Sequence, residues 1–199
     1  MPNIPLAERL RPKTIDEYIG QEHLVGRNGV FRKFFETGNV PSFILWGPPG
    51  VGKTTLAKIV ATQLDRPFFT LSAVTSGVKE VREVIESARK QRFFDQRPPF
   101  LFIDEIHRFN KSQQDSLLGA VEQGIVTLIG ATTENPSFEV ISPLLSRCQV
   151  YILRPMEDKD LQTLLDRALT ADIELREREI EVQQTGALFR FAGGDARKL

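Results

Sequence analysis

Short apolar runs alternate with amphipathic stretches along the chain as far as Pro155. Several of the runs are almost entirely apolar, which is typical of parallel strands covered by helices on both faces. Alternation of strand and helix patterns predicts an α/β fold with a five-stranded parallel sheet. The predicted strands are Phe43–Trp46, Phe68–Ser72, Phe100–Asp104, Val126–Ala131 and Gln149–Leu153.

Between these runs, apolar residues recur every three or four positions, which predicts amphipathic helices. A short helix of this kind is expected between Phe31 and Phe35, before the first strand. Gly124 is a natural stop for the last helix that precedes the fourth strand. The longer predicted helices are Lys53–Leu64, Val78–Lys90 and Ser112–Gln123.

After Pro155 the strand pattern ceases and helical spacing continues. We expect a first domain over residues 1–155 and the beginning of an all-helical domain over residues 156–199. About two helices are too few to enclose a core of their own, so we expect the sequence to stop within this domain. A lid cut short in this way predicts a mobile end, a mostly monomeric chain and weak activity. The apolar residues of these two helices are Leu161, Leu164, Leu165, Ala168, Ala187, Leu188 and Phe191.

Composition narrows the functional class. The 199 residues carry 26 Lys and Arg against 26 Asp and Glu, so the formal net charge is zero and a polybasic protein is excluded. Any contact with nucleic acid must therefore come from a local patch. Cys148 is the single cysteine, which excludes an intrachain disulfide and favours a reducing compartment. We expect no membrane association, because no apolar run approaches the length of a span and the start has no secretion signal; a cytoplasmic location follows.

The segment GPPGVGKT fits the phosphate-binding pattern GxxxxGK[ST], between an apolar strand and a helix. Glycines let the backbone wrap around phosphate oxygens, and a helix N-terminus favours the anion. Lys53 would supply a charge for the β- and γ-phosphates, and Thr54 a hydroxyl ligand for Mg²⁺. The alternative is a Gly/Pro-rich turn, which the flanking strand and helix disfavour. The predicted nucleotide-binding residues here are Gly47, Pro48, Pro49, Gly50, Val51, Gly52, Lys53, Thr54 and Thr55.

The third predicted strand ends in two acidic residues, Asp104 and Glu105, which follow three apolar residues. The carboxyl ends of parallel strands meet at one edge, so both carboxylates should lie beside the phosphate loop. Asp104 would then organise Mg²⁺, and Glu105 would polarise a water for hydrolysis; the alternative is a solvated strand end. His107 and Arg108 are interpreted as surface or local packing residues. No guanine motif follows a later strand, which favours ATP over GTP.

Five motifs in order, GPPGVGKT, LFIDEIH, GATTENPSF, LLSRC and GGDARKL, resemble the AAA+ ATPases, and within them the clamp-loader-related group. The segments Ser72–Glu80, Asp104–Asp115 and Ile129–Glu139 are similar to the replication-associated recombination protein A (RarA, also MgsA) family, which is related to the eukaryotic Werner-helicase-interacting ATPase. The resemblance covers nearly the whole chain. It implies an AAA+ P-loop fold with a helical lid.

The resemblance assigns further roles. Thr133 matches sensor 1, which aligns the attacking water, with Thr132 as the neighbouring candidate. Arg147 matches the arginine finger that reaches the ATP of a neighbouring subunit, and Arg197 matches the lid arginine of sensor 2; the alternative for each arginine is a surface ion pair. Ser72 is a candidate to restrain Glu105 until DNA binds. The residues that match the adenine pocket are Arg11, Tyr18 and Ile19.

The function implied is a DNA-dependent ATPase of replication-fork maintenance, recombination and repair, acting at DNA ends, gaps or junctions. The full-length protein would be a homo-oligomer associated with the nucleoid, with single-strand-binding protein as a further partner. One basic helical face could contact DNA, or could be a solvated face of i,i+4 ion pairs; its residues are Lys79, Arg82, Arg89 and Lys90. The alternative function is an AAA+ module that remodels a protein, but the aromatic-hydrophobic-Gly pore motif of such modules is missing between the second and third strands.

Overall fold

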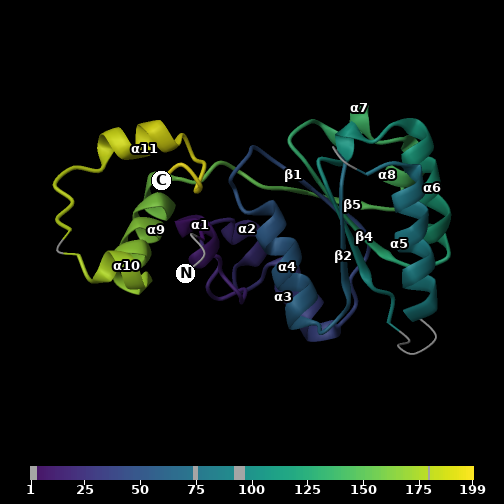
Figure 1. Ribbon diagram of the computed structural model, residues 1–199, viewed down its shortest axis with the longest axis horizontal. Helices are drawn as coiled ribbons and strands as arrows, with labels where there is room; N and C mark the ends of the chain where they lie inside the picture. Colours follow the sequence, from purple (N-terminus) through teal and green to yellow (C-terminus); the bar gives the residue numbers. More distant parts are fainter. Residues whose placement is uncertain (1–3, 74–75, 92–96, 179) are drawn as a thin grey trace.

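A five-stranded sheet forms the core of the larger part of the molecule, on the right in Figure 1. The computed structural model describes residues 4–73, 76–91, 97–178 and 180–199. The strand order is β2-β3-β4-β1-β5, and every neighbouring pair is parallel. The predicted α/β fold with a parallel sheet is therefore confirmed. The strands are β1 (Phe43–Trp46), β2 (Phe68–Ser72), β3 (Phe100–Asp104), β4 (Thr127–Thr132) and β5 (Gln149–Ile152).

Helices cover both faces of the sheet, as the apolar strands require. Alternate strand residues point to opposite faces, so Phe43 and Phe102 join one core cluster while Ile44 and Ile103 join the other. The first cluster packs under α3 and α4, and the second under α5, α6 and α8. These helices are α3 (Val30–Thr37), α4 (Lys53–Gln63), α5 (Val78–Gln91), α6 (Lys111–Glu122) and α8 (Ser142–Leu145).

Several predicted boundaries were wrong by one residue, and two of these errors have a clear local cause. Helix α6 begins at Lys111 because the Asn110 side chain accepts the Gln113 N–H, and the Gln113 side chain accepts the Asn110 N–H. Val126 was expected to open the fourth strand, but its N–H donates to the Ala120 carbonyl of α6, so Val126 belongs to the turn after this helix. The strand starts at Thr127, and at its other end it extends to Thr132, which pairs with Trp46.

Other elements are short. The N-terminal segment contributes α1 (Leu6–Arg9) and α2 (Glu22–Val25). The 3-10 helix η1 (Ile106–Arg108) follows β3, and α7 (Pro136–Glu139) follows β4. Of the segment 72–80 that carries part of the family resemblance, Val74 and Thr75 lie outside the described residues. In the part of the chain that is described, no helix has the length and apolar character needed to cross a bilayer.

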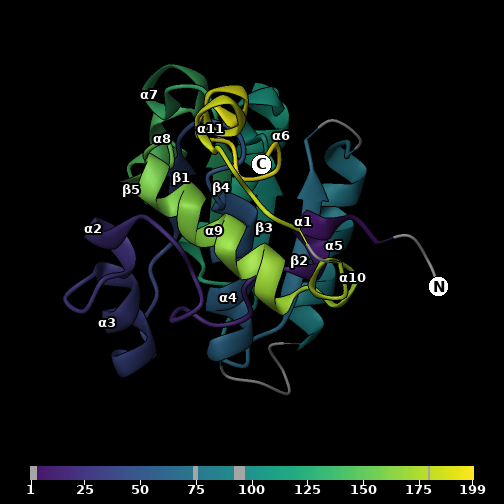
Figure 2. The same ribbon diagram turned by 90° about the vertical axis from the view of Figure 1, so that its left-hand side faces the viewer.

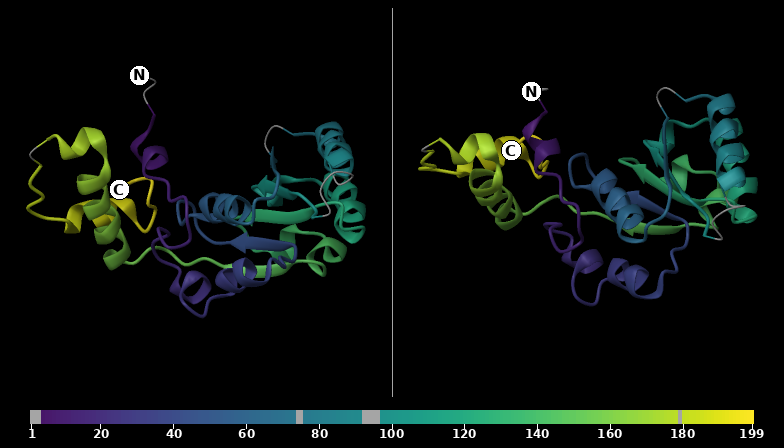
Figure 3. Two further views of the ribbon diagram at one scale, coloured as in Figure 1. Left: turned by 90° about the horizontal axis from the view of Figure 1, so that it is seen from below. Right: turned by 60° about the horizontal axis from the view of Figure 1, so that its bottom comes forward.

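The chain after β5 leaves the sheet and forms a helical lobe of α9 (Asp158–Ala171), α10 (Ile173–Arg176) and α11 (Gly186–Ala192). The N-terminal segment runs between this lobe and the sheet (Figure 3). Helix α1 lies beside α10 (Figure 2), where Arg9 Nε donates to Asp172 Oδ2 at 2.8 Å. Arg167 of α9 donates from Nη1 to the carbonyl of Glu17 at 2.9 Å. These contacts attach the first residues of the chain to the lobe.

Candidate nucleotide site

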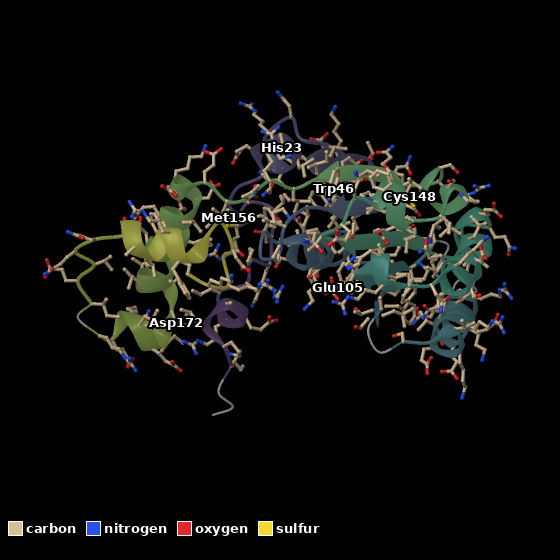
Figure 4. All side chains as sticks on the ribbon, turned by 90° about the horizontal axis from the view of Figure 1, so that it is seen from above. His23, Trp46, Glu105, Cys148, Met156 and Asp172 are labelled. Atoms are coloured by element: carbon tan, nitrogen blue, oxygen red, sulfur yellow. The ribbon has the colours of Figure 1, made fainter. Side chains whose placement is uncertain are left out.

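A cleft of about 670 Å³ lies where the carboxyl end of the sheet, the N-terminal segment and the helical lobe meet. Glu105 lies at the sheet edge that faces the lobe carrying Met156 and Asp172 (Figure 4). Most of the predicted site residues line this cleft together, although they come from five separate parts of the sequence. They are Arg11, Tyr18, Ile19, Pro49, Gly50, Gly52, Lys53, Thr54, Thr55, Asp104, Glu105, Thr133 and Arg197.

The phosphate loop is held in a shape that only glycine allows at two positions. Gly50 and Gly52 have φ angles of +73° and +97°, and Gly52 caps the N-terminus of α4. A Cβ on Gly50 would lie 1.7 Å from Asp195 Oδ1, and one on Gly52 would lie 2.4 Å from the Tyr18 hydroxyl. The loop is therefore closely packed against Asp195 and Tyr18 and leads into the N-terminus of α4, a position that favours a phosphate group. Gly47, Pro48 and Val51 complete this loop.

Lys53 folds back onto the loop. Its ammonium group donates to the carbonyls of Gly47 at 2.6 Å and Pro48 at 2.7 Å. Removal from water lowers the pKa of Lys53 to about 8, although the Asp104 carboxylate acts in the opposite direction. The group is thus preorganised at the loop, and its charge is poorly solvated until an anion arrives.

Nucleotide affinity should consequently fall as the pH rises above about 8. In the free protein, Lys53 loses its proton in this range. When a phosphate is bound, Lys53 stays protonated, so binding takes up a proton. The dissociation constant should rise toward tenfold per pH unit, which is about 1.4 kcal/mol per unit. Calorimetric titration with ADP in buffers of different ionisation enthalpy measures the proton uptake. A dissociation constant that stays flat from neutral to alkaline pH would contradict this assignment.

Asp104 ends β3 and Glu105 begins the turn that follows it. Glu105 has a left-handed φ of +53°, which is uncommon for a residue with a side chain. Its Oε2 atom lies 3.0 Å from Nε of Arg108. Ser72, predicted to restrain Glu105, pairs with Asp104 in the β2–β3 register. The role predicted for Ser72 stays a prediction, and the ion pair with Arg108 is a contact that the sequence pattern did not indicate.

The two candidate threonines for sensor 1 differ in their surroundings. Thr132 is 1% exposed, and its hydroxyl accepts the Glu134 N–H at 3.0 Å and donates to the Glu134 carbonyl at 3.1 Å. Both threonines line the cleft, and Thr133 is half-buried; within the described residues its hydroxyl makes no such bonds. Thr132 is therefore engaged with its own loop, and Thr133 is the better placed of the two to meet a ligand.

Arg197 reaches the cleft from the end of the chain and is held by Asp195. Its Nε and Nη2 atoms lie 3.1 Å and 2.9 Å from the two Asp195 oxygens. The paired guanidinium lowers the pKa of Asp195, and the carboxylate raises that of Arg197. The Ala196 N–H donates to the Gly50 carbonyl at 3.2 Å, so this segment sits directly on the phosphate loop.

The predicted adenine-pocket residues line the opposite side of the cleft. Arg11 donates from Nη1 to the Thr55 hydroxyl at 2.8 Å. The buried Tyr18 hydroxyl donates to the Val51 carbonyl at 3.1 Å, and burial raises the pKa of this phenol above its usual range. Ile19 offers an apolar surface. Sequence reasoning missed other lining residues, among them Met156, Leu164 and Arg167, although the α9 periodicity contained the signal for Leu164.

Two groups of predicted residues lie away from the cleft. Arg147 follows α8 and is exposed; its Nη2 atom lies 2.5 Å from Glu122 Oε1 on α6. The basic positions of α5 are exposed as well, and two of them are paired, Lys79 with Glu83 at 3.8 Å and Arg89 with Glu86 at 3.0 Å. Neither Arg147 nor the basic face of α5 lines the cleft of its own chain.

Comparison with known proteins identifies related sequences. Residues 43–156 match the ATPase family associated with various cellular activities (AAA). The chain is 46% identical over 197 residues to replication-associated recombination protein A of Escherichia coli, covering 98% of this chain and 44% of that protein. It is 48% identical over 195 residues to ATPase WRNIP1 of Dictyostelium discoideum, covering 97% of this chain and 22% of that protein. The chain thus spans less than half the length of these relatives.

Among solved structures, the fold matches Thermotoga maritima RuvB, described as a Holliday junction branch migration motor. The TM-score is 0.75 at 32% sequence identity, and the match covers 95% of this chain and 62% of that one. The sheet and its flanking helices thus form an AAA P-loop fold, as the sequence motifs predicted.

Proposed function

Because this chain belongs to the ATPase family associated with various cellular activities (AAA), we propose that its cleft binds ATP with Mg²⁺ and hydrolyses it to act on DNA. The observation that carries the proposal is the convergence of Lys53, Asp104 and Glu105 on one cleft. Lys53 begins α4, and Asp104 and Glu105 lie at the carboxyl end of β3 beside the phosphate loop. A phosphate loop alone would bind anions; the adjacent carboxylates add what hydrolysis needs.

In the proposed reaction, the loop backbone and Lys53 hold the β- and γ-phosphates. Glu105 accepts a proton from a water molecule as the water oxygen attacks the γ-phosphorus. The bond from this phosphorus to the β–γ bridging oxygen breaks, its electron pair leaves with ADP, and inorganic phosphate is released. Thr133 orients the water, and Arg197 contacts the phosphates from the lobe formed by residues 156–199, which acts as a lid.

The residues present fit a bound magnesium ion. Hydroxyl and carboxylate oxygens are the ligands that Mg²⁺ prefers, and Thr54 and Asp104 both line the cleft. Thr54 would bind directly and Asp104 through the water shell. When bound, the ion would neutralise charge that develops on the phosphate oxygens.

We further propose that Arg147 serves the cleft of a neighbouring subunit. Arg147 is exposed and does not line the cleft of its own chain. It belongs to the SRC motif, which directly precedes the edge strand β5. Such a role requires a homo-oligomer of the full-length protein. The similarity to replication-associated recombination protein A supports a role in replication and recombination. We propose DNA ends, gaps or junctions as the substrate, a cytoplasmic, nucleoid-associated location, and single-strand-binding protein as a partner.

Lys53→Ala should abolish nucleotide binding, because the loop loses the charge that faces the phosphates. Lys58→Ala is the matched control, since Lys58 is exposed on the same helix. Calorimetric titration with ATP and ADP measures the loss, and the ATPase rate of the full-length protein with and without single- and double-stranded DNA tests the substrate. Unchanged affinity in Lys53→Ala would refute the nucleotide site, and a rate that DNA does not alter would refute the DNA role.

A further inference from the structure

The 3-10 helix η1 carries a histidine that bonds to the end of the next strand. His107 Nδ1 lies 3.0 Å from the Thr132 hydroxyl oxygen. Thr132 is 1% exposed and His107 is half-buried, so water competes little for this bond. The bond spans 25 residues of sequence and joins β3 to β4 beyond the last pair of their ladder, Ile103 with Gly130.

Thr132 connects two further loops of the site. Its carbonyl accepts the Gly47 N–H at 3.1 Å, and Gly47 opens the phosphate loop. Its hydroxyl bonds to the Glu134 N–H and carbonyl, which fixes the backbone on both sides of Thr133. A hydroxyl has one proton and two lone pairs, so His107 takes the remaining bonding position. Every hydrogen-bonding position of the Thr132 hydroxyl is thereby occupied, and the side chain of His107 supplies the last of these bonds.

The turn that contains His107 is also bonded to Glu105, through Arg108. The Arg108 N–H donates to the Glu105 carbonyl at 2.8 Å, which closes the turn that contains His107. The Arg108 guanidinium also lies 3.0 Å from the Glu105 carboxylate. Glu105, His107 and Arg108 therefore belong to one hydrogen-bonded turn, through which a displacement of His107 would act on Glu105.

We propose that His107 is a positioning residue for ATP hydrolysis, which holds the Glu105 turn in register with Thr133 and the phosphate loop through its bond to Thr132. The inference rests on the proposed function. His107 itself does not line the cleft and acts only through Thr132. The interpretation of His107 as a surface or packing residue does not account for a bond to a buried hydroxyl that joins three loops of the site.

The test separates binding from turnover in the full-length protein. His107→Ala should lower kcat by about 10- to 100-fold, the size expected when a catalytic group is displaced by about 1 Å. The Kd for ADP should stay within about twofold, because the phosphate loop keeps its own contacts. His107→Asn should recover most of the rate, because its amide can occupy the position of Nδ1, whereas His107→Gln, whose amide matches Nε2, should not. His23→Ala, on α2, is the histidine control.

A double-mutant cycle with Thr132→Val tests the route. If both side chains act through one bond, His107→Ala and Thr132→Val together should lower kcat no further than the more damaging single change. Losses that multiply would overturn the proposal, as would wild-type kcat in His107→Ala or equal rates in the Asn and Gln variants. The Asn and Gln comparison decides the matter should the alanine variant not fold.

Imidazole nitrogen NMR reads the bond without any nucleotide. The 199-residue chain contains two histidines, His107 and His23, so its spectrum is readily assigned. Thr132→Val should shift the Nδ1 resonance of His107 and leave those of His23 in place. An unshifted resonance overturns this inference alone. Absence of ATP hydrolysis in the wild-type protein overturns the proposed function instead, and the positioning role with it.

Discussion

Glu105→Gln is expected to bind ATP as well as the wild-type protein and to lose ATP turnover by about 10²- to 10⁴-fold, the contribution of a positioned general base. The amide keeps the shape of the carboxylate but cannot accept the water proton. Binding should persist because the phosphate loop and Lys53, whose ammonium bonds to the loop carbonyls, are untouched. Loss of the ion pair with Arg108 should have little effect on stability, since both side chains are partly exposed.

Equilibrium titration with ATP and a steady-state assay of phosphate release together measure the two effects. Glu139→Gln is the matched control, because Glu139 is exposed on α7. Turnover at the wild-type rate in Glu105→Gln would place the general base elsewhere. Weaker ATP binding together with slower turnover would indicate that Glu105 supports the site structurally.

Arg147→Ala is expected to bind ATP almost normally in the full-length protein and to hydrolyse it poorly. An arginine that contacts the transferring phosphate from a neighbouring subunit is worth about 10³- to 10⁵-fold in rate, and it adds little to ground-state binding. The ion pair of Arg147 with Glu122 is half-exposed, so its loss should not unfold the chain. Arg190→Ala, an exposed arginine of α11, controls for a general loss of charge.

Mixing variants tests whether Arg147 acts between subunits. Lys53→Ala subunits keep the arginine but lose the pocket, so together with Arg147→Ala they form interfaces that pair one intact pocket with one intact arginine. The restored ATPase rate should rise with protein concentration, because assembly is required. If the mixture never exceeds the sum of the two variants, or if Arg147→Ala alone is fully active, the inter-subunit role is wrong.

Sequence patterns predicted the sheet and the phosphate loop well, because both depend on local spacing. The apolar runs located all five strands, and GPPGVGKT specified the loop and the start of α4. Boundary errors arose where a side chain or turn decides the end, as with the Asn110 cap and the turn that contains Val126. Parallel-strand topology placed Asp104 and Glu105 beside the phosphate loop, whereas the other distant residues of the cleft were found only where a family motif named them.

Pairings between such distant residues were the part that spacing could not predict. The bond from the Ala196 N–H to the Gly50 carbonyl required knowledge of how the end of the chain folds onto the phosphate loop. The bond between His107 and Thr132 depends on the register of β3 and β4, and a shift of one residue would break it. Sequence pattern specifies the elements, whereas the register and the lobe contacts decide which polar side chains meet.

The position of β1 has a consequence for how the chain acquires its structure. β1 lies between β4 and β5, which both follow it in the sequence and are synthesised later. The strands that pair with β1, and so support the phosphate loop that follows it, are therefore absent until more than half of these 199 residues have been synthesised. Strand pairings of such large sequence separation form slowly, since the intervening chain must first be closed into a loop. The nucleotide loop is thus encoded early and assembled late, after the segment that carries Glu105 and Thr132 has emerged.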